Sequence, residues 1–413
     1  MDRAQLALLL GAPAGLVAEP RREATVVRSG EPRRYMAEFA LAVAQGGVVM
    51  LASDTWGENE DRQLAALRQQ EQTTPATLAG KGWLCIPTGG SSGQLKFARH
   101  DEETLAAAVR GFARHFGITQ INAVGVLPLH HVSGLMAWLR CALTGGEYQP
   151  LDWKEVEGGQ RPVLPPKPGG WVISLVPTQL ERLLGDAGAV AWLKSFRIIF
   201  LGGAPAWPDL LDRAAALGLP LSLGYGMTET AAMVTALRPE EFLAGARNNG
   251  PALPHATVRI GAGDTIVLGG ESLFRGYHPE WRDPGDFATQ DHGLLDERNH
   301  LFVLGRRDAV IITGGEKVDP VEIEAVLRGT GQFPDLVVLG LPDAKWGQLL
   351  VVVYPGQAHP DFHAVIRVTN GLAHYKRPKS YIPLVGAWPA TAQGKINRAA
   401  LVERVVAQLK VRR

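Results

Sequence analysis

The hydrophobic pattern in the middle of the chain predicts buried strands separated by helices. Apolar runs at 124–128, 172–176 and 198–201 are short and are bounded by turn-forming residues. Helical patterns with marked ends lie among them, such as the one that begins after Asp101 and ends before Gly117. Aspartate is a favoured N-cap, and glycine often follows the last turn of a helix. Strands that alternate with helices favour mostly parallel sheets with helices on their faces, so we expect an α/β fold.

The pattern changes towards the carboxyl end of the chain. A helix is expected at 319–329, where an aspartate–proline pair can open it and a glycine can close it. Short apolar strands are expected at 336–339 and 349–354. We therefore expect two domains: a large one over 1–305, and a small α+β one over 309–413.

Composition and charge narrow the class of protein. Of the 413 residues, 46% are apolar and 20% are charged, and the formal net charge of +1 gives no basic field for nucleic acid. No apolar run reaches the roughly 18 residues of a membrane span, and the amino-terminal segment lacks the pattern of a signal peptide. Because the only cysteines are Cys85 and Cys141, we expect no disulfide framework and a cytoplasmic protein.

The segment from Thr88 to Lys96, Thr-Gly-Gly-Ser-Ser-Gly-Gln-Leu-Lys, has the composition of an anion site. Its glycines let backbone N–H groups turn towards a phosphate, and its hydroxyls and lysine add donors. A flexible surface turn is the structural alternative. Gly89 to Gly93 also fits the G-x-S-x-G pattern of serine hydrolases, but that reading needs a helix directly after the serine, where we expect a loop.

A second candidate segment runs from Ser222 to Glu229. Tyr225 offers an aromatic face, Thr228 a hydroxyl and Glu229 a carboxylate. Such a set can stack a base, contact a phosphate and hold Mg²⁺ through a single carboxylate. The structural alternative is an ordinary helix start with Thr228 as its cap.

These two segments belong to an ordered series of motifs. The others are Leu-Gly-Gly-Ala-Pro at 201–205, Asp-His-Gly-Leu-Leu-Asp at 291–296, Gly-Arg-Arg-Asp at 305–308, the segment 312–322 and Thr-Ala-Gln-Gly-Lys-Ile-Asn-Arg at 391–398. The series resembles the acyl-adenylate-forming family, which includes acyl- and aryl-CoA ligases and peptide-synthesis adenylation domains. The resemblance covers residues 88–398 and implies an ATP- and Mg²⁺-dependent ligase that passes an acyl group to coenzyme A.

The resemblance also implies where the nucleotide binds. The implied triphosphate contacts are Thr88, Gly89, Gly90, Ser91, Ser92, Gly93 and Lys96, and those near the adenine are Gly202, Gly203, Ala204, Pro205, Tyr225 and Gly226. Thr228 would contact the α-phosphate, and Glu229 would hold the magnesium ion. Asp291 would accept both ribose hydroxyls, as a carboxylate can, and Arg306 would help to hold the same sugar.

Residues of the small domain are implied in catalysis. Lys395 matches the lysine that bridges the substrate carboxylate and the α-phosphate, where a cation lowers the barrier to the approach of two anions. Asp308 matches the hinge about which the small domain rotates after adenylation. That rotation would withdraw Lys395 and bring Gly314, Gly315 and Lys317 to the path by which the thiol reaches the adenylate.

The acid is indicated by the segments 128–140 and 176–180, which look like those of the 2-succinylbenzoate–CoA ligases of menaquinone and phylloquinone synthesis. This acid carries two carboxylates, so the one that is not activated needs a cationic partner. Arg140 suits that role because guanidinium binds carboxylate through two hydrogen bonds and stays charged, although a structural ion pair is the alternative. The implied pocket residues are His131, Ser133, Arg140 and Thr178.

Departures from the family pattern leave the charged groups in place. Gly90 stands where threonine or serine is usual, Gln290 where glycine is usual and Gln393 where serine is usual. Another aryl or acyl substrate remains an alternative. An amino-acid adenylation enzyme would normally carry an aspartate after the histidine motif, and this chain has none there. The sequence does not indicate an oligomeric state.

Overall fold

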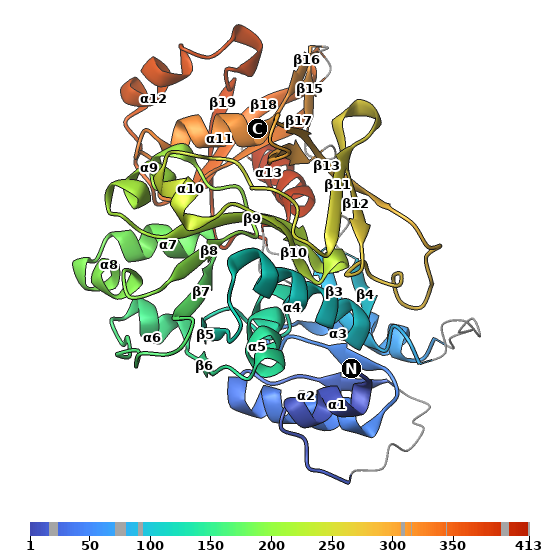
Figure 1. Ribbon diagram of the computed structural model, residues 1–413. Coiled ribbons are helices and arrows are strands. Elements are labelled where there is room, and N and C mark those ends of the chain that lie inside the picture. The colour runs from blue at the N-terminus through green and yellow to red at the C-terminus, as the bar shows by residue number, and fades with distance from the viewer. Residues whose placement is uncertain are drawn as a thin grey trace.

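The described residues of the computed structural model form four β-sheets with helices packed around them (Figure 1). These residues are 1–15, 24–70, 80–89, 94–306, 310–314, 316–343, 345–389 and 396–411. The sheet nearest the carboxyl end, drawn in orange and red, lies above the sheets formed by the earlier part of the chain. The parallel sheets and their helices confirm the α/β class, whereas the exact domain limits stay a prediction.

The first sheet carries the glycine-rich segment. Its strands lie in the order β1 (Thr25–Val27), β2 (Val49–Leu51), β3 (Leu84–Gly89) and β4 (Leu95–His100). The first three strands are parallel, and β4 runs antiparallel to β3. The helices of this part are α1 (Arg3–Leu9), α2 (Pro32–Gln45) and α3 (Glu58–Arg68).

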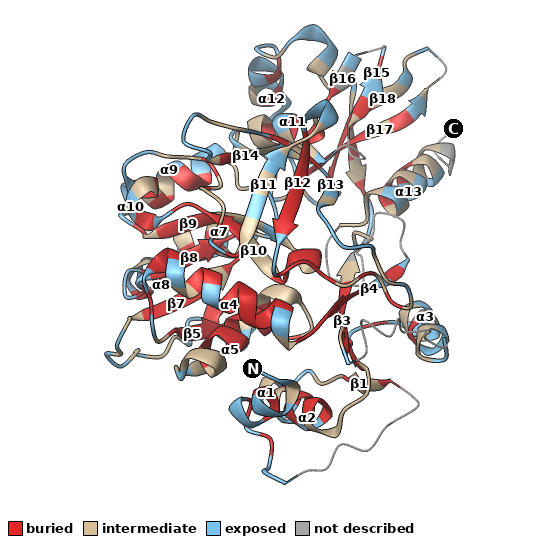
Figure 2. Cartoon of the chain, turned by 45° about the vertical axis from the view of Figure 1, so that its right-hand side comes forward, coloured by how far each residue is buried: buried red, intermediate tan, exposed pale blue. Residues whose placement is uncertain are grey.

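The central sheet is parallel except at one edge, where β10 runs antiparallel to β9. Its order is β10 (Ala232–Ala236), β9 (Leu221–Met227), β8 (Ile198–Leu201), β7 (Trp171–Leu175), β5 (Asn122–Gly125) and β6 (Tyr148–Pro150). The helices around it are α4 (Glu102–Phe116), α5 (Val132–Thr144), α6 (Trp153–Glu157), α7 (Pro177–Leu184), α8 (Ala187–Leu193), α9 (Pro208–Ala216) and α10 (Pro239–Leu243). Figure 2 shows that its central strands are buried.

Two of the three strands predicted in this region match closely. The runs at 172–176 and 198–201 correspond to β7 and β8, whereas the run at 124–128 corresponds to a strand that has already ended at Gly125. Pro128 has no N–H for a strand ladder, which is consistent with the early end. The predicted helix after Asp101 is α4, and Gly117 follows it in the left-handed conformation, with φ of 61°.

Asp101 ties together three segments that are distant in the sequence. Its buried carboxylate accepts hydrogen bonds from the N–H groups of Thr104 and Gly82, both at 3.1 Å, and from Nε of Arg275 at 2.7 Å. Burial alone would raise the pKa of Asp101, but the hydrogen bond and charge of Arg275, together with the backbone donors, hold it below its ordinary value. Residues 275–278 therefore run beside β4.

The third sheet is antiparallel, in the order β11 (Ala256–Ile260), β12 (Thr265–Gly270), β13 (Phe287–Leu295) and β14 (Leu301–Arg306). The fourth sheet has the order β16 (Glu316–Val318), β15 (Ile311–Thr313), β18 (Gly347–Pro355) and β17 (Val337–Asp343), and β19 (Ser380–Leu384) pairs with β18. Its helices are α11 (Pro320–Arg328), α12 (Phe362–Thr369) and α13 (Arg398–Val411). The predicted helix at 319–329 is α11, capped by Asp319 and followed by Gly329.

Two contacts among the described residues join the fourth sheet and its helices to the earlier part of the chain. The guanidinium carbon of Arg328 lies 5.5 Å from the ring centre of Trp207, at the start of α9. A Cβ atom added to Gly305 would lie 2.9 Å from the Asp319 carboxylate, so glycine permits a close approach there. Among the described helices, none is long and apolar enough to cross a membrane.

Candidate active site

Four of the candidate site residues follow strands whose carboxyl ends meet at one edge of the central sheet. β5, β7, β8 and β9 are parallel to their neighbours in this series. His131 follows β5, Thr178 follows β7, Gly203 follows β8 and Glu229 follows β9. Open α/β sheets bind ligands outside the carboxyl ends of their strands. The strand order therefore brings together residues that the sequence separates widely.

The glycine-rich segment connects β3 to β4. Thr88 and Lys96 stand opposite each other in this antiparallel pair. Gly89 ends β3, whereas Gly90, Ser91, Ser92 and Gly93 lie outside the described residues. A nucleophile elbow requires a helix directly after the serine, but a strand begins at Leu95. This observation argues against the serine-hydrolase alternative.

Glu229 is buried at the centre of the candidate site. Its Oε1 accepts a hydrogen bond from the Tyr277 hydroxyl at 2.7 Å and one from the Thr88 hydroxyl at 3.3 Å. Burial, followed by the charge of Glu229 and the hydrogen bond to it, raises the pKa of Tyr277 well above its ordinary value, so this phenol is a proton donor. Lys96 Nζ lies 5.7 Å from the Tyr277 ring centre. The segment predicted to bind phosphate and the residue predicted to hold magnesium are therefore neighbours.

A histidine that the sequence analysis did not single out supports Thr228. His100 is fully buried, and burial lowers its pKa to about 4, so the ring is neutral. Its Nε2 donates to the Thr228 carbonyl oxygen at 2.8 Å, and Nδ1 lies 3.1 Å from the Thr104 hydroxyl. After Glu229 the backbone enters the left-handed region at Ala231 and Ala232, with φ of 51° and 78°. Such strain in residues other than glycine is concentrated at functional sites.

Tyr225 and Asp291 form a second tyrosine–carboxylate pair. The Tyr225 hydroxyl donates to Asp291 Oδ2 at 2.5 Å, and both side chains lie mostly inside the protein. Burial, then the charge of Asp291, raises the pKa of Tyr225 well above its ordinary value, so the phenol stays protonated. Asp291 on β13 stands opposite Arg306 on β14, as expected if both contact one sugar. The carboxylate keeps acceptor capacity for a ribose hydroxyl.

Glu229 and the neighbouring Thr88 suit a magnesium ion that binds together with the phosphates of the substrate. In the described ranges no group of three or more His, Cys, Asp or Glu side chains converges as an all-protein metal site. Protein-bound Mg²⁺ usually takes one or two carboxylates and completes its shell with water and substrate phosphates. Glu229 beside Thr88 fits that pattern, whereas a structural zinc or calcium site would need more protein ligands.

The turn predicted to lie near the adenine follows β8. Gly202, Gly203, Ala204 and Pro205 form it, and Gly203 has a φ of 79° that favours glycine. A Cβ atom on Gly202 would lie 3.8 Å from the Gly224 carbonyl oxygen, which directly precedes Tyr225 on β9. The turn and the tyrosine ring are thus carried by neighbouring strands, although their contact with adenine stays a prediction.

Arg140 is buried on α5 without the structural ion pair that the sequence left open. Its guanidinium carbon lies 4.0 Å from the ring centre of Phe112 on α4, and its Nε is buried without a hydrogen-bond partner. The structure gives the guanidinium no hydrogen bond or ion pair to any described residue. Burial lowers the pKa of Arg140 to about 10. A buried cation of this kind calls for an anionic partner.

His255 lies close to this arginine and was also missed by the sequence analysis. Both of its ring nitrogens are buried and without a hydrogen-bond partner. A Cβ atom on Gly111 would lie 1.8 Å from His255 Nδ1, so the ring occupies space that only glycine leaves free on α4. Burial, then the charges of Arg140 and Arg110, lowers the pKa of His255 to about 4. A neutral imidazole without a hydrogen-bond partner therefore lies in the same buried region as a guanidinium that has no ion pair to a described residue.

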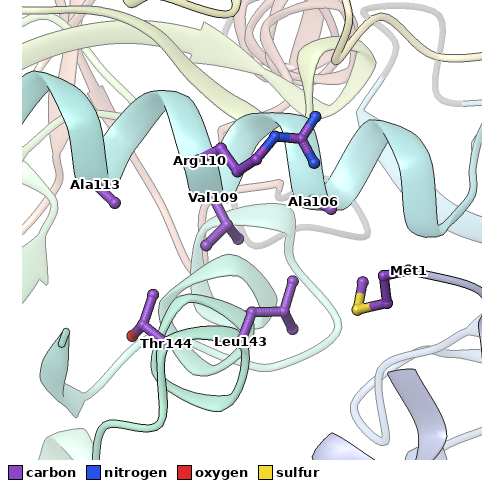
Figure 3. A pocket seen from close by; sticks show the side chains of 7 residues that line it. All are labelled: Met1, Ala106, Val109, Arg110, Ala113, Leu143 and Thr144. Carbon is purple, nitrogen blue, oxygen red and sulfur yellow. The ribbon is translucent and has the colours of Figure 1, made fainter. Parts of the chain in front are cut away.

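A small pocket lies between α4 and α5, separate from the residues predicted to bind the nucleotide or the acid. It has a volume of about 230 Å³, and Figure 3 shows Val109, Leu143 and Thr144 pointing into it. Arg110 also lines it, but its side chain extends along α4. None of the residues predicted to bind the nucleotide or the acid lines this pocket, so we do not assign the active site to it.

Comparison with known proteins decides the family. The pattern of the AMP-binding enzymes matches residues 19–278. The chain belongs to this family. A 2-succinylbenzoate–CoA ligase of Enterococcus faecalis is 32% identical over 354 residues, covering 81% of this chain and 71% of the relative. One of Listeria monocytogenes is 34% identical over 328 residues, covering 77% of this chain and 69% of the relative.

Solved structures share the fold of this AMP-binding enzyme. The o-succinylbenzoate CoA synthetase (MenE) of Bacillus subtilis, in complex with its acyl-adenylate intermediate, matches with a TM-score of 0.73 and 22% identity, over 97% of this chain and 91% of that one. ATP-bound MatB of Rhodopseudomonas palustris matches with a TM-score of 0.76 and 23% identity, over 97% and 91% of the two chains. At these identities, the likeness concerns the fold.

Several predicted residues of the AMP-binding enzyme are only partly placed. Asp308, Gly315 and Lys395 lie outside the described residues, and only the backbone of Lys317 is described. Gly314 has a φ of 60°, and its N–H donates to the Trp346 carbonyl oxygen at 2.8 Å. The roles of these residues at the hinge and the thiol path stay predictions.

Asp291 offers a direct test of the ribose contact. We expect Asp291→Asn to raise the KM for ATP about tenfold or more, because a hydrogen bond to a charged group is worth about 1.5–3 kcal/mol. The KM for the acid should change little. Asp286→Asn is the control, since Asp286 is exposed and pairs with Arg259 at 3.0 Å. Equal KM values for ATP in both variants would contradict the ribose assignment.

Proposed function

We propose that this chain is an ATP- and Mg²⁺-dependent ligase that joins 2-succinylbenzoate to coenzyme A through an acyl-adenylate. The family, and relatives named 2-succinylbenzoate–CoA ligase that are matched over more than two thirds of their length, support an acid–CoA ligase. We place the reaction in menaquinone or phylloquinone synthesis and in the cytoplasm, where the two free, buried thiols of Cys85 and Cys141 would stay reduced.

The reaction has two half-reactions. First, a carboxylate oxygen of the acid attacks the α-phosphorus of ATP, and pyrophosphate leaves with the electron pair of the broken P–O bond. Thr228 and Lys395 would stabilise charge on the α-phosphate, and Glu229 would hold Mg²⁺, which neutralises phosphate charge when bound. Second, the thiol sulfur of coenzyme A loses its proton and attacks the acyl carbon, and AMP leaves as the thioester forms.

The burial of Arg140 without an ion pair in the described part of the chain is the observation that supports the substrate assignment. A fatty acid or benzoate offers only the carboxylate that is activated, so it would leave this buried guanidinium unpaired. An acid with a second carboxylate would pair that group with Arg140, whose charge helps to keep the His255 ring neutral. Hydrogen bonds between a guanidinium and a carboxylate are strong and geometrically specific.

A substrate panel tests this proposal. Purified protein with ATP, Mg²⁺ and coenzyme A should release pyrophosphate and AMP with 2-succinylbenzoate, and should do so poorly with benzoate, fatty acids or amino acids. The measurement is acid-dependent pyrophosphate release together with detection of the thioester. Turnover confined to fatty acids or to amino acids would overturn the substrate, and the absence of adenylation with every acid would overturn the ligase assignment.

A further inference from the structure

The residues on either side of the segment that contains Lys395 pack against one hydrophobic core. Trp388 lies before the segment and Ile396 after it, and both pack against the same cluster of residues from β17, β18, β19 and α13. The N–H of Asn397 donates to the Pro389 carbonyl oxygen at 2.8 Å. Lys395 itself lies outside the described residues, but it directly precedes one of these anchors.

Arg398, at the first position of α13, adds a polar anchor. Its Nη2 donates to Glu324 Oε1 at 2.6 Å, and its Nη1 donates to the Val338 carbonyl oxygen at 2.8 Å. The same Glu324 oxygen accepts from the Val338 N–H at 2.8 Å. The guanidinium, the carboxylate and the backbone of one β17 residue therefore close a ring of three hydrogen bonds.

Burial makes this ring more restrictive than a surface ion pair. The Glu324 residue is 8% exposed, on the inner face of α11, whereas the Arg398 side chain is about a third exposed. Exposed ion pairs contribute little, but a buried carboxylate that loses its partner is costly. A shift of Arg398 would therefore leave the Glu324 carboxylate with one donor fewer, and the start of α13 is tied to β17 through these contacts.

We propose that Arg398 and Glu324 form a positioning pair that fixes where Lys395 stands during adenylation. This inference rests on the proposed function, because it assumes that Lys395 acts in the first half-reaction. Neither residue needs to touch the substrate. Displacement of a catalytic group by about 1 Å can cost on the order of a hundredfold in rate, so the rigidity of the chain beside a catalytic lysine matters.

The test measures the two half-reactions separately in the full chain. Adenylation is followed by acid-dependent exchange between pyrophosphate and ATP, and thioesterification by the reaction of supplied 2-succinylbenzoyl-adenylate with coenzyme A. We expect Arg398→Ala to lower the exchange rate about 10- to 100-fold while thioesterification stays close to that of the wild type. Arg398→Lys should restore part of the exchange, because it keeps a cation but cannot donate in the same two directions.

Glu324→Gln gives a second, milder variant, since the amide oxygen can still accept both hydrogen bonds. Its exchange rate should lie between those of the wild type and Arg398→Ala. The matched control is Glu322→Gln on the same helix, because Glu322 pairs with Lys376 on the exposed side at 2.6 Å. This control should leave both half-reactions unchanged.

The possible failures are distinguishable. Equal loss of both half-reactions in Arg398→Ala and Arg398→Lys, or no loss of exchange in either variant, would overturn the positioning pair while the proposed function stands. A wild-type protein that neither exchanges pyrophosphate with any acid nor uses the supplied adenylate would overturn the proposed function itself. Thermal unfolding of each variant identifies one that fails to fold, in which case Arg398→Lys and Glu324→Gln carry the test.

Discussion

Replacement of Lys395 with alanine is expected to lower adenylate formation by about 10²–10³-fold, the usual cost of removing one group that stabilises developing charge. The attack of a carboxylate on the α-phosphorus brings two anions together, and the lysine would lie between them. The second half-reaction consumes the adenylate and needs no such cation. Formation of the thioester from supplied adenylate should therefore proceed at nearly the wild-type rate.

Pre-steady-state measurement of pyrophosphate release in the first half-reaction, and of thioester formation from supplied adenylate in the second, checks this expectation. Lys376→Ala is a suitable control, because this lysine lies on the same part of the chain but pairs with Glu322. If Lys395→Ala slowed both half-reactions to the same extent, the lysine would not be specific to adenylation. The idea that the small domain presents different residues in the two steps would then lose its support.

The helix ends and strands that depend on neighbouring residues could be predicted from the sequence. The cap at Asp101, the glycine after α4, the helix at 319–329 and the strands at 172–176 and 198–201 depend on neighbouring residues. The order of the motifs was also sufficient to indicate the family, because it requires only their succession along the chain.

Residues that depend on distant pairing were missed. Tyr277 reaches Glu229 because residues 275–278 run beside β4, which in turn depends on Arg275 and the buried Asp101. His255 meets α4 at Gly111, and no periodicity relates these two positions. A lone histidine after a proline carries no local pattern, so only the packed structure could associate it with Arg140.

The sequence predicted that Arg140 pairs with the second carboxylate of the acid. The buried surroundings of its side chain allow a more specific expectation. We expect Arg140→Met to lower kcat/KM for 2-succinylbenzoate about 10²–10³-fold, because one partner of a buried charge pair is worth about 2–5 kcal/mol. For analogues that keep only the activated carboxylate, kcat/KM should fall much less. The measurement is the ratio of the two kcat/KM values in the wild type and the variant.

Thermal stability separates binding from a structural role for the same side chain. The free protein holds the Arg140 guanidinium in a buried place, where its charged form is disfavoured and its Nε has no partner. Methionine has a similar length and no polar group, so it removes an unmet desolvation cost while it keeps an apolar contact with Phe112. The Tm of Arg140→Met without ligands should therefore equal or exceed that of the wild type, whereas 2-succinylbenzoyl-adenylate should stabilise the variant less.

A lower Tm in the free variant would mean that Arg140 supports the fold. A higher Tm, together with lost selectivity for acids that carry two carboxylates, would mean that the protein keeps a destabilising buried cation in order to bind the second carboxylate of its substrate.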